Sequence, residues 1–391
     1  AQAIERNGKI YWYTSSESKL YGYHVVGVVV GDSPQGPFTP GRTTSLTKQF
    51  GDIDPTVFID NDGQAYLYYG NNCLRYGLLN EDMVSLKDGA HEITLTADGF
   101  GGVKQNNKVV GKDCYEEGPW IYRRGDTYYL VYAAGGVPEH IAYSTSASPT
   151  GPWTYRGVIM PTQGGAFTNH PGVIDFKGHS YLFYHNGALP KGGGFTRSVC
   201  VEEFKYNADG TFPQINMTGS GAQPVATLNP YIRTEAETIA WSYGVKTDQE
   251  TAMGVYVDSI DNGDYIKVRE VDFGTEGASS VKASLKGIGG GMMTIYADNP
   301  KSSPLATIQV AANTDWKELS ASLSQQLTGK HDLYFLFNGS VANMMQFDWW
   351  QFQSGDVSAI DMVNASDVAQ CEDTYTLEGI KETAPQKGLN I

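Results

Sequence analysis

The sequence predicts an all-β protein whose first domain is a β-propeller and whose second is a β-sandwich. A polar turn followed by an aromatic strand occurs four times, at intervals of roughly 50 to 60 residues, a period typical of propeller blades. The turns carry Gly8, Gly63, Gly125 and Gly178. A second repeated element, "GDSPQGPFTP" and "SASPTGPWTY", follows the first and third of these hairpins. The abundance of glycine (46 residues) and aromatic residues (12 %) is typical of turn-rich β folds.

The four hairpins define the first domain, at residues 1–228. Their segments are "IERNGKIYWYTS", "FIDNDGQAYLYYG", "YRRGDTYYLVYAAG" and "DFKGHSYLFYHNG". Small residues and proline around residues 219–231 indicate a linker. Short alternating strands then predict a β-sandwich at 229–353. Residues 354–391 are acidic and weakly patterned, so we interpret them as a tail of unknown role.

Composition excludes several classes of function. The net charge of −15 argues against nucleic acid as a partner, because little positive charge is present to neutralise phosphates. No run of about 18 apolar residues predicts a membrane span. The four cysteines, Cys73, Cys114, Cys200 and Cys371, are widely spaced and include no CxxC, so we expect mostly buried free thiols.

Two acidic residues lie at matching places on successive repeats, Asp54 in "DIDPTVF" and Glu117 in "CYEEGPW". Each precedes a proline, which we interpret as a turn, and then the blade hairpin. Because the first strands of propeller blades line a shared channel, both carboxyl groups are expected to point into one pocket. Glycosidases need two such groups beside the scissile bond. Asp52 and Glu116 are weaker candidates, and the alternative is that Asp54 caps a turn and Glu117 is a surface acid.

Four segments, "DIDPTVF", "EGPW", "TNHPGVIDF" and "RSVCVEEF", resemble glycoside hydrolase family 43 in order and spacing. That family consists of five-bladed propellers that cleave arabinose or xylose from plant polysaccharides with inversion. Downstream, "RTEAETIAW", "DNGDYIKV" and "FDWWQF" resemble a carbohydrate-binding module of family 6, a β-sandwich. The combination is most similar to the arabinoxylan arabinofuranohydrolase branch, and it covers residues 1 to about 352.

The resemblance implies roles for four residues of the first domain. Glu117 matches the general acid, and Asp54 matches the carboxylate that orients this acid and raises its pKa. His170 resembles a histidine that meets an ion or water on the propeller axis, although a hydrogen-bonded core histidine is the alternative. Arg197 resembles an arginine that holds sugar hydroxyls in the pocket, against the alternative of a surface arginine.

The resemblance also implies a general base, an aspartate on a first blade, that the 391 residues do not provide. Only four hairpins are found, and the leading blade is absent. A propeller without one blade would expose strand edges and apolar surface. We therefore expect a missing N-terminal segment that carries the base, either omitted from this sequence or present as a separate chain.

In the second domain the resemblance implies a structural calcium ion. Its candidate ligands are Glu235 and Glu237 on the first strand and Asp348 on the last, although all three could instead be solvated. Trp316 resembles the aromatic residue that stacks on sugar rings, or it is half-buried packing. Gln346 stands where an asparagine often binds sugar, which puts the usual cleft in doubt.

These observations lead to a hypothesis of function. The protein is expected to be a secreted or cell-surface, inverting α-L-arabinofuranosidase that acts on arabinoxylan or a related plant cell-wall polysaccharide. The alternatives are a β-xylosidase or arabinan-directed hydrolase on the same scaffold, and a non-catalytic polysaccharide-binding protein. The preferred linkage, the substitution pattern and the oligomeric state are not specified by the sequence.

Overall fold

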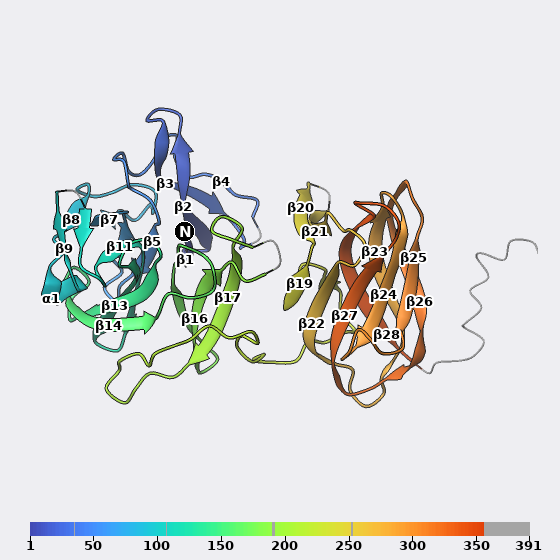
Figure 1. Ribbon diagram of the computed structural model, residues 1–391. Coiled ribbons are helices and arrows are strands. Elements are labelled where there is room, and N and C mark those ends of the chain that lie inside the picture. Colours follow the sequence, from blue (N-terminus) through green and yellow to red (C-terminus); the bar gives the residue numbers. More distant parts are fainter. Residues whose placement is uncertain (35, 107, 190–191, 252, 356–391) are drawn as a thin grey trace, which may run out of the picture. The chain divides into compact units, whose positions relative to one another are not determined.

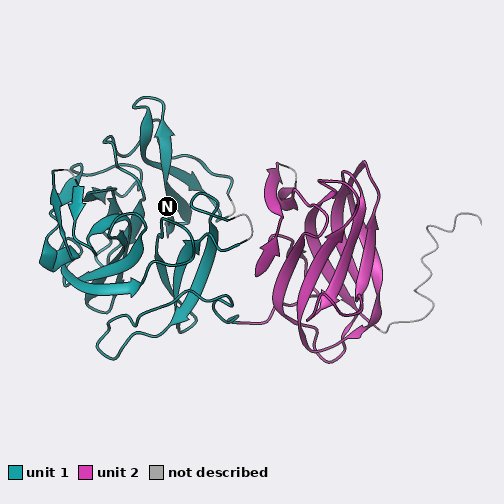
Figure 2. Cartoon of the chain, in the orientation of Figure 1, with its two compact units in different colours: residues 1–225 teal, residues 226–391 magenta. Residues whose placement is uncertain are grey.

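The computed structural model describes residues 1–34, 36–106, 108–189, 192–251 and 253–355 (Figure 1). The chain separates into two compact units, residues 1–225 and 226–391 (Figure 2). The expected all-β class is confirmed, since one short helix, α1 (Ala97–Phe100), accompanies the strands of the described residues. No helix in these ranges is long and apolar enough to cross a membrane.

Unit 1 contains four antiparallel sheets in which neighbouring strands follow the chain order. Three have four strands and the last has three, and a separate hairpin pairs β9 with β10. The strands are β1 (Gln2–Arg6), β2 (Lys9–Ser18), β3 (Tyr23–Gly31) and β4 (Thr39–Pro40); β5 (Thr56–Ile59), β6 (Ala65–Tyr69), β7 (Leu74–Leu79) and β8 (His91–Ile93); β9 (Val103–Gln105) and β10 (Lys108–Val110); β11 (Tyr115–Arg124), β12 (Thr127–Ala134), β13 (His140–Ser146) and β14 (Thr154–Met160); and β15 (Gly172–Phe176), β16 (His179–Asn186) and β17 (Ser198–Phe204).

Each repeated hairpin forms the first two strands of one of these sheets. The β1–β2 turn places Asn7 (φ 55°) and Gly8 (φ 76°) in the left-handed region, and the β15–β16 turn does the same with Lys177 and Gly178. Two successive left-handed residues match the right-handed twist of the flanking strands, which is why glycine stands at the second position. The polar turns of the sequence therefore fix the register of the blades.

Apolar clusters fill the space between consecutive sheets of unit 1. One joins Tyr13 and Val26 of the first sheet to Leu67 of the second. The next two join the second sheet to the third and the third to the fourth. Cys73 and Cys114 are buried free thiols and Cys200 is a half-buried one, while Cys371 lies outside the described residues. Face-to-face packing of successive sheets is the arrangement of propeller blades.

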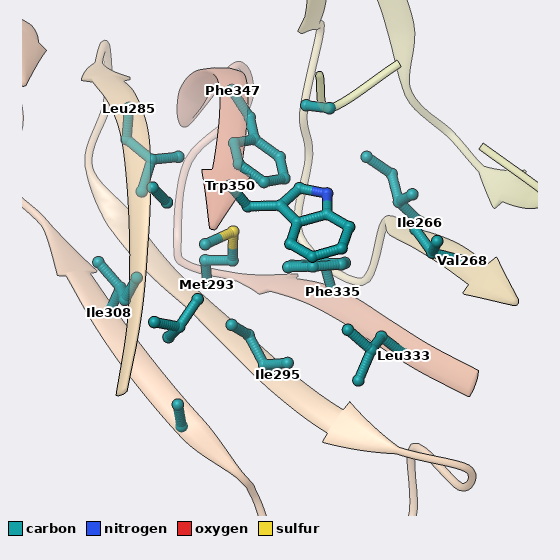
Figure 3. Packing of buried hydrophobic residues seen from close by; sticks show 14 of the residues in the cluster. Ile266, Val268, Leu285, Met293, Ile295, Ile308, Leu333, Phe335, Phe347 and Trp350 are labelled. Carbon is teal, nitrogen blue, oxygen red and sulfur yellow. The ribbon is translucent and has the colours of Figure 1, made fainter. Parts of the chain in front are cut away.

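Unit 2 is a sandwich of two antiparallel sheets. One has the order β20-β21-β28-β23-β26, with β18 also paired to β28, and the other has the order β19-β22-β27-β24-β25. The strands are β18 (Thr234–Glu235), β19 (Trp241–Tyr243), β20 (Lys246–Glu250), β21 (Gly254–Asp258), β22 (Tyr265–Asp272), β23 (Ala278–Gly287), β24 (Gly291–Ala297), β25 (Ala306–Val310), β26 (Thr314–Leu327), β27 (Lys330–Asn338) and β28 (Met345–Ser354). Phe335, Phe347 and Trp350 pack between the sheets with Met293 and Ile295 (Figure 3). Of the expected tail, residues 356–391 lie outside the described ranges.

Candidate active site

The structure brings together three residues from the starts of three successive sheets. Ligand atoms of Asp54, Glu117 and His170 all lie within 4.8 Å of one another. The Nε2 atom of His170 is 3.0 Å from Oε1 of Glu117, and the amide of Asn71 donates a hydrogen bond to the other oxygen, Oε2. The expected meeting of the two carboxyl groups in one place is therefore found.

The local backbone differs from the expected turn at Glu117. Asp54 lies just before β5 in a left-handed conformation (φ 57°), and its N–H donates to Oγ of Ser15 at 2.9 Å. Glu117, however, lies within β11, between two shifts in the register with β12. Pro119 has no N–H to donate to a ladder, so the strand is irregular there instead of turning. This irregularity lies directly at Glu117 and Gly118.

Gly118 provides the space that His170 occupies. Its φ is 57°, and an added Cβ would lie 2.9 Å from Cγ of His170. Both the backbone conformation and the close approach require glycine.

We expect Gly118→Ala to disturb the site and the stability together. The left-handed backbone alone costs a non-glycine residue about 1–2 kcal/mol, and the new methyl group displaces the imidazole ring from Glu117. Turnover should fall by about 100-fold, as expected for a misplacement near 1 Å. Steady-state kinetics and chemical denaturation measure both effects. Gly125→Ala is the control, because Gly125 has a similar φ of 60° but open space around its Cβ position; equal losses of turnover in the two variants would contradict this role for Gly118.

The charges of the site are coupled. Burial raises the pKa of Asp54, and the Glu117 carboxylate adds to this shift. Burial also raises the pKa of Glu117, but the hydrogen bond and the charge of His170 outweigh it and lower that pKa to about 2. The expected raised pKa of Glu117 is therefore not found in the sugar-free site, because the contact with His170 outweighs the causes that raise it. Burial and the Glu117 carboxylate raise the pKa of Glu139 to about 8, so Glu139 holds a proton at neutral pH.

Glu117 is thus ionised in the sugar-free site. It can donate a proton only if its contact with His170 changes and its pKa rises. Burial lowers the pKa of His170, but the hydrogen bond to Glu117 and the Asp54 charge outweigh it, so this pKa is raised. The imidazolium is therefore the group that holds Glu117 in its ionised form.

Arg197 reaches this site through Thr168 and His185, whose ring lies beside that of His170. Its Nη1 donates to Oγ1 of Thr168 at 2.8 Å and is 3.4 Å from Nε2 of His185. The ring of His185 is 5.7 Å from that of His170. Burial lowers the pKa of His185 to about 4, so this ring is neutral beside the guanidinium. No hydrogen bond from Arg197 to Glu117 or Asp54 is recorded among the described residues.

Three residues of this site had no signal in the sequence interpretation. Asn71 follows an aromatic strand, Glu139 stands in "GGVPEHIAYS" and His185 lies within β16. The only local signal for Glu139 is that it is an acid beside a proline at the start of a strand, although it follows Pro138 whereas Asp54 precedes Pro55.

The expected calcium ligands of unit 2 lie near one another but are not all free. Strand β18 pairs with β28, which sets Glu235 opposite Trp349, next to Asp348. Glu235 is paired with Arg233 at 2.9 Å. Both carboxylate oxygens of Asp348 and Oε2 of Glu237 are buried and accept no hydrogen bond within the distance limit, and Oδ2 of Asp348 lies 3.5 Å from Nη2 of Arg233, with which it forms an ion pair. Buried carboxylate oxygens without donors fit a bound cation.

The expected sugar-stacking residue of unit 2 is half-buried. Trp316 packs edge-to-face against Tyr256, with ring centroids 5.2 Å apart, and Lys286 lies 5.9 Å from the indole ring. The amide of Gln346 donates to Asp258 at 2.8 Å. At this position Trp316 packs against Tyr256 and keeps part of its surface exposed, so both expected roles, packing and stacking on a sugar ring, fit it.

Comparison with known proteins follows the same division of the chain. The family model described as glycosyl hydrolases family 43 matches residues 1–212, and the carbohydrate binding module (family 6) matches residues 235–354. An arabinoxylan arabinofuranohydrolase of Bacillus subtilis is 33 % identical over 84 % of this chain and 70 % of its own length. Another, from Paenibacillus polymyxa, is 30 % identical over 84 % of this chain, which spans only 56 % of that relative. A solved family 43 arabinoxylan arabinofuranohydrolase from Bacillus subtilis, in complex with cellotetraose, has a TM-score of 0.73 and 29 % identity, and the match covers 90 % of this chain and 78 % of that one.

Proposed function

Because the chain belongs to glycosyl hydrolases family 43 and carries a family 6 carbohydrate-binding module, we propose that it releases α-L-arabinofuranosyl side chains from arabinoxylan with inversion. The observation that carries the proposal is the convergence of Asp54, Glu117 and His170 within 4.8 Å. The two arabinoxylan arabinofuranohydrolases at 33 % and 30 % identity support the choice of substrate.

In this mechanism Glu117 donates a proton to the oxygen of the leaving xylose. Asn71 and His170 fix the two oxygens of its carboxyl group. Asp54 has a buried oxygen, Oδ2, without a hydrogen-bond partner, and a sugar hydroxyl can satisfy it. Arg197, held by Thr168, is the candidate for a further contact with the sugar.

Inversion also needs a carboxylate that activates water from the opposite side of the sugar. We propose that a further sheet carries this base, from a segment outside residues 1–391 or from a separate chain. Apolar side chains exposed on the outer faces of the first and last sheets of unit 1 support this: Trp12, Ile174, Phe176, Phe183 and Val199. Val199 is 81 % exposed. Several apolar side chains exposed together on one sheet face are unusual unless another surface covers them.

Three substrates test the proposed specificity. The protein is incubated with an aryl α-L-arabinofuranoside, an aryl β-D-xyloside and arabinoxylan, and the released sugars are separated and their anomers followed by NMR. We expect arabinose released first as the β anomer. Release of xylose alone would favour the β-xylosidase alternative, and binding of arabinoxylan without release of any sugar, even with formate present to replace a missing base, would favour the non-catalytic one.

A small anion tests the proposed position of the base. If the base is absent from residues 1–391, azide or formate should restore turnover of an activated aryl arabinofuranoside, because either anion can replace the missing carboxylate or its water. Full turnover without the anion would mean that the base lies within the chain.

For unit 2, we propose that residues 229–353 form the module, bind plant cell-wall polysaccharide and hold a structural calcium ion at Glu235, Glu237 and Asp348. We also propose that the protein is secreted or at the cell surface, because a wall polymer is too large to enter a cell. Three buried carboxylate oxygens that accept no hydrogen bond, two of Asp348 and one of Glu237, support the metal site, although Arg233 already lies 3.5 Å from Asp348.

We expect calcium at saturating concentration to raise the free energy of unfolding of unit 2 by about 1–3 kcal/mol, and chelation to remove this gain. Hydrogen exchange along β23 and β28 in the full chain measures it. Asp348→Asn should abolish the response, whereas Asp332→Asn should keep it, because Asp332 is paired with Lys267 at 2.8 Å. A calcium response that survives Asp348→Asn would contradict the proposed site.

A further inference from the structure

We propose that Glu139 is a positioning residue for the catalytic acid: its buried carboxyl group fixes the segment 167–170 and thereby holds His170 against Glu117. This inference rests on the proposed function, because Glu117 must be the acid for its position to matter. Glu139 lies between β12 and β13, directly before His140.

Two hydrogen bonds join Glu139 to the backbone of that segment. Its own N–H donates to the carbonyl of Phe167 at 3.0 Å, and its Oε2 accepts the N–H of Asn169 at 2.8 Å. The segment has no regular secondary structure before β15 begins at Gly172. Irregular backbone does not fix its own position, so contacts from a neighbouring sheet must supply it.

The same carboxyl group also lies against His170. Its Oε2 is 3.9 Å from Nε2 of His170, the atom that is 3.0 Å from Oε1 of Glu117. The side chain of Glu139 is only 1 % exposed, and its protonated carboxyl group forms a hydrogen bond with the Glu117 carboxylate. Burying a carboxyl group in this way is costly for folding alone. Its place beside His170 gives that cost a functional reason.

Two substitutions of Glu139 distinguish the position of its side chain from its ability to carry charge. Glu139→Gln keeps the length of the side chain and an oxygen that accepts the Asn169 N–H, whereas Glu139→Asp keeps the carboxyl group but shortens its reach. We expect Glu139→Gln to stay within about threefold of the wild-type kcat. Glu139→Asp and Glu139→Ala should lose about 10- to 100-fold, the scale of a displaced general acid.

The diagnostic measurement is the dependence of kcat on the leaving group. A series of aryl α-L-arabinofuranosides with phenols of increasing pKa is used, with azide or formate present if the wild type needs it. Activated phenols leave without protonation. The kcat of Glu139→Asp should therefore fall by less than threefold on substrates with these phenols, and by about 10- to 100-fold on substrates with the poorest leaving groups. KM should change by less than threefold throughout.

Glu202→Ala is the matched control. Glu202 is also a buried glutamate of unit 1 that accepts backbone and side-chain hydrogen bonds, from Thr218 and Tyr184. Its removal should lower the melting temperature as Glu139→Ala does, without any dependence on the leaving group.

Three outcomes would overturn the inference: equal losses on all leaving groups in Glu139→Asp, a Glu139→Gln variant as poor as Glu139→Asp, or a leaving-group dependence in Glu202→Ala. Glu117→Ala run on the same series tests the proposed function separately. If Glu117→Ala shows no leaving-group dependence, the assignment of the acid fails; if it does and Glu139→Asp does not, only the inference on Glu139 fails.

Discussion

Replacing Glu117 by glutamine is expected to lower kcat on arabinofuranosides with poor leaving groups by about 10²- to 10⁴-fold, the usual contribution of a general acid. The amide keeps the size of the side chain, so the space beside Asn71 and His170 stays filled. It has no proton of suitable acidity to give to the leaving oxygen. Steady-state kinetics on the aryl series measures the loss, which should shrink toward activated phenols.

The neighbouring glutamate supplies the control for this substitution. Glu116 is half-buried, and burial followed by the Glu117 charge raises its pKa, but it has no recorded hydrogen bond to His170 within the described residues. Glu116→Gln should therefore stay within about threefold of the wild type on every substrate. A large loss in Glu116→Gln, or full activity in Glu117→Gln, would mean that the acid has been assigned to the wrong residue.

The pH dependence should distinguish the two variants as well. A general acid acts only when protonated, so the wild-type kcat falls as pH rises through the pKa of Glu117 in the sugar complex. In the sugar-free protein the imidazolium of His170 holds the pKa of Glu117 at about 2. Activity near neutral pH therefore requires the bound sugar to raise this pKa. Glu117→Gln should lack the fall at high pH, and Glu116→Gln should keep it.

The blades could be predicted because their signals are local. A polar residue followed by glycine between aromatic strands specifies a hairpin within about ten residues, and four hairpins of this kind in phase specify repeated sheets. Asp54 and Glu117 were found for the same reason, since each occupies a fixed place in its repeat. The irregular strand at Glu117 was missed, because a proline inside a strand and a proline in a turn have the same local sequence.

The rest of the site depends on contacts between sheets, which leave no local pattern. Asn71 reaches Glu117 from 46 residues away, and Glu139 meets Asn169 across 30 residues. The direction of the Glu117 pKa shift follows from a 3.0 Å contact with His170, so a family resemblance to a pair of carboxylates could not supply it. In unit 2 the resemblance placed Glu235 and Asp348 together as ligands, but it gave no sign of the ion pair of Glu235 with Arg233.

Trp350→Ala is expected to destabilise unit 2 by about 3–5 kcal/mol, the cost of removing a large aromatic side chain from a packed core. Trp350 is 1 % exposed and packs beside Phe335 (Figure 3). Its ring lies 5.5 Å from that of Phe335 and 5.7 Å from that of Phe352. These rings come from both sheets of the sandwich, so the cavity would lie between the sheets, where neither can close it without shifting its strands.

Substitution of the adjacent Trp349 is the control, because it removes a side chain of the same size from outside the core. Successive side chains of a strand point to opposite faces, and Trp349 is half-buried with Arg233 5.4 Å from its ring. Trp349→Ala should therefore cost less than about 1.5 kcal/mol, the range of a surface aromatic and cation–π contact. Hydrogen exchange along β27 in the full chain reports on unit 2 alone, because unit 1 contributes no amides there. Similar losses of protection in the two variants would mean that the core of the sandwich is not centred on Trp350.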